Sequence, residues 1–80
     1  MDILKEVHDY VRGEFRVKEA TIPVDQNILG CGVIDSMGLL KLVTFIEDRF
    51  DFEAAEGDIT PENFGTLEKI RAFVERKTKA

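Results

Sequence analysis

The feature that most constrains this chain is the change of pattern at residues 32–40, where a glycine-containing loop becomes an apolar-periodic segment. The change falls at Asp35 and Ser36. Side-chain oxygens of Asp and Ser accept hydrogen bonds from the unpaired amides of a helix's first turn. The sequence therefore predicts a helix that starts at Ser36, with the hydroxyl exposed at the positive end of the helix dipole. Such a position favours a phosphoester.

Residues 36–50 have the spacing of a helix with one buried side. At 100° per residue, five apolar side chains fall within an arc of roughly 100°. This expected core stripe consists of Leu39, Leu42, Val43, Ile46 and Phe50. The opposite side carries Met37, Lys41, Thr44 and Asp48, with Leu40 and Glu47 at the border. Met37 is therefore expected to be exposed beside the serine.

Two further segments have helical periodicity. Residues 2–15 place apolar side chains at three- and four-residue spacing, which predicts the first helix. After Thr66, expected to cap it, the last helix has an inner stripe of Leu67, Ile70, Phe73 and Val74. Residues 51–57 are expected to be a linker that ends at Gly57 and in which Phe52 and Ala54 pack against the rest of the chain. Residues 58–64 predict one short helical turn, with Thr60 as cap, Pro61 in the first helical position and Gly65 as its end.

Residues 16–34 break the helical pattern and predict a long loop. Pro23 disfavours helix at the residue before it, and loops of this length usually serve function or are anchored. The apolar residues expected to anchor the loop against the helices are Ile22, Val24, Ile28, Leu29 and Val33. Cys31 is interpreted as a small apolar filler, and His8 as a partly exposed side chain without a chemical role.

Length and composition predict one domain over residues 1–80. Sixteen acidic residues against eleven basic ones give a net charge of −5, which argues against nucleic-acid binding and suits basic partner surfaces. A single cysteine excludes an internal disulfide and suits a reducing cytoplasm. No apolar run is long enough to span a membrane, and no metal-ligand spacing is present. The expected fold is all-α: a small four-helix bundle with three main helices, a short third helix and a long loop after the first.

With this order of elements, the chain resembles the acyl carrier protein family, including its peptidyl and aminoacyl members. The resemblance spans essentially the whole length and centres on two motifs, Gly32-Val33-Ile34-Asp35-Ser36-Met37 and Phe64-Gly65-Thr66-Leu67. It implies that a phosphopantetheinyl transferase moves 4′-phosphopantetheine from coenzyme A onto Ser36, with Asp35 as the acid before the attachment serine. The arm then carries an acyl or aminoacyl thioester from a loading ligase to downstream acyl-transfer enzymes. The resemblance implies a monomeric carrier and not an enzyme.

Two positions depart from the pattern of fatty-acid carriers. Where the second helix of those proteins usually carries acids, this chain has Gly38 and Lys41. Partners of fatty-acid carriers dock on that helix through basic patches, so the difference favours a specialised carrier over bulk fatty-acid synthesis. The residues expected to contact partners are Met37, Leu40, Thr44, Glu47 and Asp48.

The resemblance also implies where a cargo could bind. Family members can hold an acyl chain between the second helix and the short third helix, and the matching lining here is Leu39, Leu42, Ile46, Ile59 and Phe64. The bulk of Phe64, together with Phe50 and Phe52, predicts little room for a long chain and favours a short or polar cargo. Fatty acyl, aminoacyl and polyketide cargoes all remain open.

Two other classes of function compete with the carrier interpretation. In a helical interaction adaptor with no prosthetic group, Ser36 would be only an N-cap or a phosphorylation site. A serine hydrolase would need a base to activate the hydroxyl. His8 is the one histidine, and Ile34 stands where the Gly-x-Ser-x-Gly elbow requires glycine.

Overall fold

The structure is a computed structural model that describes residues 2–15, 21–29 and 34–78. Its helices are α1 (Ile3–Glu14), α2 (Ser36–Phe50), α3 (Pro61–Phe64) and α4 (Leu67–Thr78), with a 3-10 turn, η1 (Glu56–Asp58), before α3. The described ranges contain no strand. The predicted all-α fold of acyl-carrier type is therefore confirmed. No helix in these ranges is both long and apolar enough to cross a membrane.

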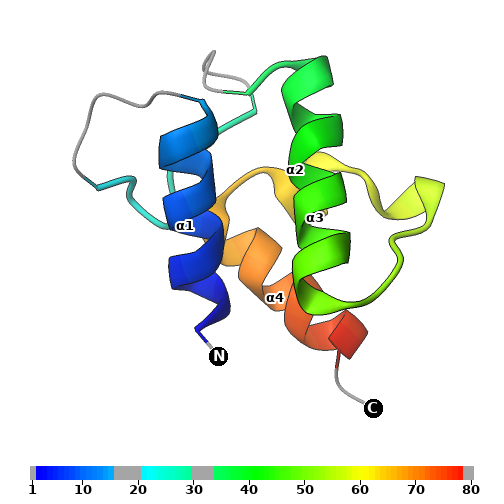
Figure 1. Cartoon of the computed structure of the whole chain (residues 1–80). Helices are drawn as coiled ribbons and strands as arrows, with labels where there is room; N and C mark the ends of the chain where they lie inside the picture. Colours follow the sequence, from blue (N-terminus) through cyan, green and yellow to red (C-terminus); the bar gives the residue numbers. More distant parts are fainter. Residues whose placement is uncertain (1, 16–20, 30–33, 79–80) are drawn as a thin grey trace.

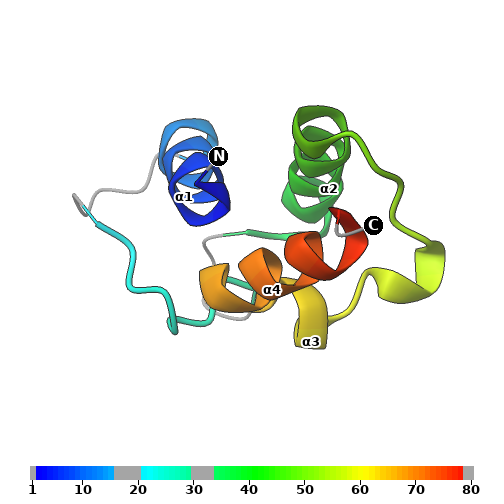
Figure 2. The ribbon, with the colours of Figure 1, turned by 90° about the horizontal axis from the view of Figure 1, so that it is seen from below.

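The helix α4 holds the bundle together. In Figure 1, α1 and α2 run side by side in opposite directions, and Figure 2 shows α4 lying against both of them. Contacts from α4 also reach α3.

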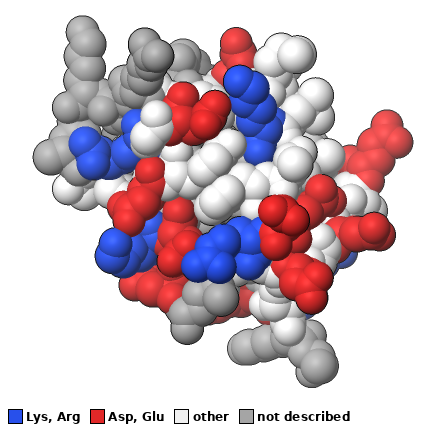
Figure 3. All heavy atoms as spheres, viewed as in Figure 1, with Lys and Arg blue, Asp and Glu red and all other residues white. Residues whose placement is uncertain are grey.

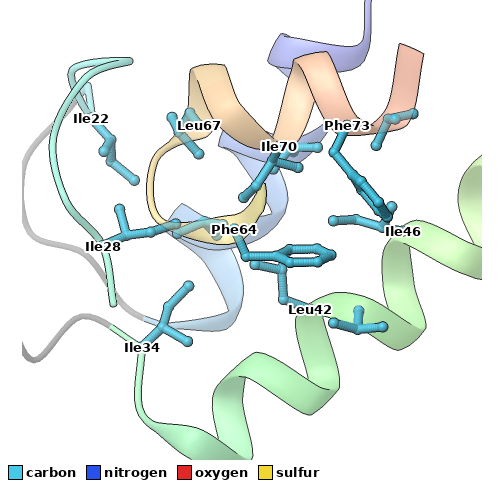
Figure 4. Close-up of a cluster of buried hydrophobic side chains, with 13 residues drawn as sticks. Ile22, Ile28, Ile34, Leu42, Ile46, Phe64, Leu67, Ile70 and Phe73 are labelled. Atoms are coloured by element: carbon cyan, nitrogen blue, oxygen red, sulfur yellow. The ribbon is translucent and has the colours of Figure 1, made fainter. Parts of the chain in front are cut away.

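The buried side chains form one apolar cluster, to which all four helices and the long loop contribute (Figure 4). The Phe64 ring from α3 is fully buried and its centroid lies 5.1 Å from that of Phe73 in α4. Three members of the stripe predicted for α2 are buried, namely Leu42, Val43 and Ile46. The other two, Leu39 and Phe50, are half-buried and pack at the edge of the cluster.

Local capping explains where α1 and α4 begin. The Asp2 carboxylate accepts a hydrogen bond from the Lys5 amide at 3.1 Å. The Thr66 hydroxyl accepts one from the Lys69 amide at 3.1 Å, which confirms the predicted cap of α4. Thr60 occupies the predicted cap position of α3, but its side chain makes no capping hydrogen bond, so that part of the prediction was wrong.

The segment between α2 and α3 is more structured than predicted. Residues 56–58 form the 3-10 turn η1, which the sequence pattern did not reveal, and the helical turn proper begins at Pro61. The Asp58 carboxylate stabilises η1 by accepting a hydrogen bond from the Ala55 amide at 3.0 Å. Phe52 and Ala54 pack against the core as expected.

Gly65 ends α3 and lets the chain turn tightly into α4. A Cβ at this position would lie 2.5 Å from the Pro61 carbonyl oxygen, a distance that no side chain tolerates. The Gly65 carbonyl also accepts a hydrogen bond from the Ile28 amide at 2.8 Å, so it anchors the long loop.

The described part of the loop is held by backbone hydrogen bonds as well as apolar anchors. Ile22 and Ile28 are buried, as predicted. The prediction for Val24 was wrong: its side chain is 42% exposed, and its carbonyl instead accepts the Glu68 amide at 3.0 Å, at the start of α4. The predicted roles of Cys31 and Val33 lie outside the described residues.

His8 has a structural role that the sequence did not predict. Its Nε2 accepts a hydrogen bond from the Ile22 amide at 3.1 Å, which ties the loop to α1. Its Nδ1 lies 3.1 Å from Asp9 Oδ1. A neutral imidazole that donates through Nδ1 and accepts through Nε2 satisfies both contacts.

Candidate functional site

Ser36 is the first residue of α2 and is exposed to solvent. The residue before it, Asp35, has an extended backbone and accepts two hydrogen bonds. Its carboxylate oxygen Oδ1 accepts the Gly38 amide and its carbonyl accepts the Leu39 amide, both at 2.8 Å. This geometry confirms that Asp35 caps α2 and fixes the position of the serine.

The surroundings of Ser36 fit an attached phosphodiester. Within the described part of the chain, its hydroxyl has no hydrogen-bond partner, so it is available for modification. The Asp35 carboxylate is held by the Gly38 amide. The other amides of the first turn and the helix dipole favour negative charge at this end of α2.

A shallow apolar groove begins at Ser36. It has a volume of about 270 Å³ and is lined by Leu29, Ile34 and Leu39 together with Asp35 and Ser36. Leu29 and Ile34 belong to the anchored loop, and Leu39 belongs to α2. The groove therefore offers apolar surface next to the serine on the loop side of the helix.

A larger groove lies between α1 and α2. It has a volume of about 420 Å³, and its lining consists of Tyr10, Met37, Leu40, Lys41, Thr44 and Phe45. Met37 and Leu40 are 69% and 56% exposed. In Figure 3 the surface over the first turns of α2 includes an uncharged area, whereas acidic and basic side chains mix over the lower part of the face.

The residues predicted to contact partners separate into two groups. Met37, Leu40 and Thr44 all line the groove between α1 and α2. Asp48 is exposed further along the helix. The half-buried Glu47 accepts a hydrogen bond from the Ala54 amide at 2.8 Å, so its carboxylate holds the linker after α2.

Tyr10 and Phe45 complete this groove, although the sequence did not indicate them as surface residues. Their rings stack with centroids 3.9 Å apart and planes 10° from parallel. The Tyr10 hydroxyl donates to the Lys41 carbonyl at 3.4 Å. Burial, with a smaller contribution from Glu14, raises the pKa of Tyr10. These contacts join helices that are distant in sequence, so periodicity carried no signal for them.

Lys41 and Gly38, the two departures from the fatty-acid carrier pattern, both have partners on α1 or at its end. Lys41 Nζ lies 3.6 Å from Glu14 Oε2. Gly38 is buried, and a Cβ built on it would lie 2.6 Å from Cε1 of Phe15. Glycine at position 38 therefore allows close packing against Phe15, although glycine is a weaker helix former than alanine.

The residues predicted to line an acyl pocket lie near one another. Leu42, Ile46 and Phe64 are buried in the core, while Leu39 and Ile59 pack against it half-buried. A cargo site among them stays a prediction. Among the described residues no cluster of His, Cys, Asp and Glu side chains could hold a metal ion.

Comparison with known proteins identifies the relatives of this chain. No family model matches it. A D-alanyl carrier protein of Streptococcus sanguinis is 30% identical over 70 residues, which cover 88% of this chain and 87% of the relative. D-alanyl carrier proteins of Streptococcus gordonii and Streptococcus thermophilus are each 29% identical over the same share. With these relatives and an all-helical bundle, the chain belongs to the acyl carrier protein family, whose members carry cargo and are not enzymes.

Proposed function

We propose that this chain carries an aminoacyl group, D-alanine, on a 4′-phosphopantetheine arm attached to Ser36. The observation that carries the proposal is the exposed serine at the first position of α2, beside a cap that fixes it. Relatives named for a D-alanyl cargo support the choice of cargo. The lack of an acid in the first turn of α2 is consistent with a dedicated pathway separate from bulk fatty-acid synthesis.

The attachment step uses the serine hydroxyl as the nucleophile. A phosphopantetheinyl transferase would supply the base and the magnesium ion for this reaction. The Ser36 oxygen forms a bond to the phosphorus that bears the pantetheine, and the hydroxyl proton passes to that base. The bond between this phosphorus and the adenosine bisphosphate part of coenzyme A breaks, and 3′,5′-bisphosphoadenosine leaves.

Once attached, the arm supplies a terminal thiol that holds the aminoacyl group as a thioester. This chain's own residues keep the point of attachment fixed. The cap at Asp35 and the contact of Gly38 with Phe15 hold the start of α2, and α4 holds α2 in the bundle. A loading ligase and an acyl-transfer enzyme would meet the carrier in turn, and brief contacts that raise the association rate suit such encounters.

The packing of the core supports a short cargo. Phe64 is fully buried against Phe73, and the Phe52 ring approaches Phe73 at 5.8 Å between centroids. These rings fill the region that would have to open for a long acyl chain. A D-alanyl group requires no such opening.

Intact-mass spectrometry tests the attachment. The purified chain is incubated with coenzyme A and a promiscuous phosphopantetheinyl transferase, and Ser36→Ala is treated in parallel. The proposal expects one added phosphopantetheine group on the natural chain and none on the variant. An unmodified natural chain would favour the interaction adaptor with no prosthetic group, and equal modification of both proteins would place the arm elsewhere.

A second experiment tests the cargo. The modified chain is offered D-alanine, L-alanine or glycine with ATP and a D-alanine-activating ligase. D-alanine is expected to form a hydroxylamine-sensitive adduct faster than the other two.

Carriers loaded chemically with acyl groups of increasing length should show no steady rise in melting temperature, because a long chain has no preformed place in the core. A steady rise would indicate that the native state binds long chains and would contradict the short-cargo proposal.

A further inference from the structure

The contact between Gly38 and Phe15 joins the end of α1 to the start of α2. Gly38 lies in the first turn of α2 and is buried. A Cβ placed on it would meet Phe15 Cε1 at 2.6 Å, Asp35 Oδ1 at 3.2 Å and Ile34 Cγ2 at 3.2 Å. Real Cβ atoms do not approach another atom at 2.6 Å. The Phe15 ring therefore occupies the space that a side chain at position 38 would need.

The Phe15 ring is itself held in place from the α1 side. Phe15 is the C-terminal cap residue of α1, and its amide donates to the Val11 carbonyl at 3.0 Å. Its ring meets Tyr10 edge-on, with centroids 6.2 Å apart. The Tyr10 ring in turn stacks on Phe45 of α2. A short series of aromatic rings therefore connects the middle of α2 to its first turn by way of α1.

We propose that Phe15 is a positioning residue for the attachment reaction, acting on Ser36 through Gly38. The amide of Gly38 closes the Asp35 cap, and its Cα surface rests on the Phe15 ring. Movement of Gly38 would move the cap and, with it, the serine two residues earlier. This inference rests on the proposed function of Ser36 and adds to it a residue outside the attachment motif.

The contact also determines what a partner can recognise on the first turn of α2. An acidic side chain at position 38 would collide with Phe15 and lie beside the Asp35 carboxylate. The first turn has no acid, and its exposed neighbour is the apolar Met37. A transferase or ligase that binds this turn therefore meets the apolar Met37 on a fixed backbone, and the exposed Asp35 carboxylate of the cap is the acid beside it.

Four variants test the proposal: Gly38→Ala, Phe15→Leu, the double variant that combines them, and Gly13→Ala. The last is a matched control, because a Cβ at Gly13 meets nothing within 4 Å. Two quantities are measured, namely kcat/KM for phosphopantetheinyl transfer to each protein and the hydrogen-exchange rate of the Gly38 amide. Denaturant midpoints show which variants are folded.

The expected pattern is one of loss and rescue. Gly38→Ala should lower kcat/KM by about tenfold or more, because small displacements of a reacting group are costly, and should speed exchange of the amide at position 38. Phe15→Leu removes the colliding ring atom, so the double variant should recover most of the lost kcat/KM. Gly13→Ala should behave like the natural chain.

Several results would overturn the proposal. A Gly38→Ala protein modified at the natural rate would do so, as would a double variant no faster than Gly38→Ala. If Gly38→Ala fails to fold, Phe15→Leu serves as the test. A Phe15→Leu protein that is modified as fast as the natural chain, and whose Gly38 amide exchanges as fast, would exclude a positioning role for Phe15. If the natural chain is not modified at all, the proposed function fails, whereas exchange at Gly38 still reports on the contact.

Discussion

The Asp35 carboxylate lies 2.8 Å from the Gly38 amide and closes the first turn of α2. Replacing Asp35 with alanine removes this acceptor, and we expect the free energy of unfolding to fall by about 1 kcal/mol. Asp35→Asn should retain most of the stability, because asparagine caps helices about as well as aspartate. Urea denaturation measures both variants. An unchanged midpoint for the alanine variant would show that the cap contributes nothing to stability.

His8 should contribute to stability through the loop that it anchors. His8→Leu keeps a side chain of similar size but leaves the amide of the buried Ile22 without its acceptor. We expect this loss to lower the free energy of unfolding by about 1–3 kcal/mol. His8→Gln offers a carbonyl oxygen at similar reach and should be closer to the natural chain. Denaturant midpoints and hydrogen exchange at Ile22 measure the effect. Equal exchange at Ile22 in all three proteins would contradict the anchoring role.

The exposed apolar residues beside Ser36 should affect partner encounters and leave the fold intact. Met37→Ala and Leu40→Ala are each expected to slow phosphopantetheine transfer or aminoacyl loading with little change in melting temperature, because both side chains are largely exposed. Val24→Ala is the matched control, since Val24 is an exposed apolar residue on the loop. Rates that are unchanged with several partners, or lowered equally by Val24→Ala, would exclude a specific role for this surface.

The ion pair between Asp58 and Lys77 should make the free energy of unfolding depend on pH. A hydrogen bond from Lys77 Nζ at 2.9 Å, with a second from the Ala55 amide, holds the pKa of Asp58 below its ordinary value. A carboxyl group with a lower pKa in the folded state stabilises the fold above its unfolded pKa of about 4, and this contribution is lost as the pH falls through the folded value.

Asp58→Asn isolates that contribution from those of the other acids. The natural chain should be more stable than the variant at pH 7, and the difference should shrink as the pH falls below about 4. Urea midpoints at neutral and acidic pH measure it. A difference that stays constant or grows on acidification would contradict the assigned direction of the shift.

The parts of the fold that sequence could predict are those governed by local chemistry. The spacing of apolar residues predicted α1, α2 and α4. The caps at Asp35 and Thr66 could be predicted because a capping side chain lies within three residues of the amide that donates a hydrogen bond to it. The end of α3 at Gly65 was likewise a local signal. The proposed attachment at Ser36 rests on the family resemblance together with these local signals.

What sequence could not predict depends on residues that are far apart in the chain. The contact of Phe15 with Gly38, the stack of Tyr10 on Phe45 and the hydrogen bond from Ile22 to His8 all join separate elements. Periodicity within one helix carries no information about which side chain of another helix it meets. For the same reason the sequence indicated Gly38 only as a departure from the acidic pattern of fatty-acid carriers, whereas the structure shows a glycine packed against an aromatic ring.

The most direct test of the central claim is to locate the arm on the chain. Protein coproduced with a phosphopantetheinyl transferase is digested, and the peptide that contains Ser36 is fragmented in a mass spectrometer. We predict one phosphopantetheine group on the Ser36 oxygen, and after loading, a D-alanyl group on the same arm that hydroxylamine releases. An unmodified Ser36 peptide from a sample in which a control carrier is fully modified, or an arm on another residue, would contradict the account.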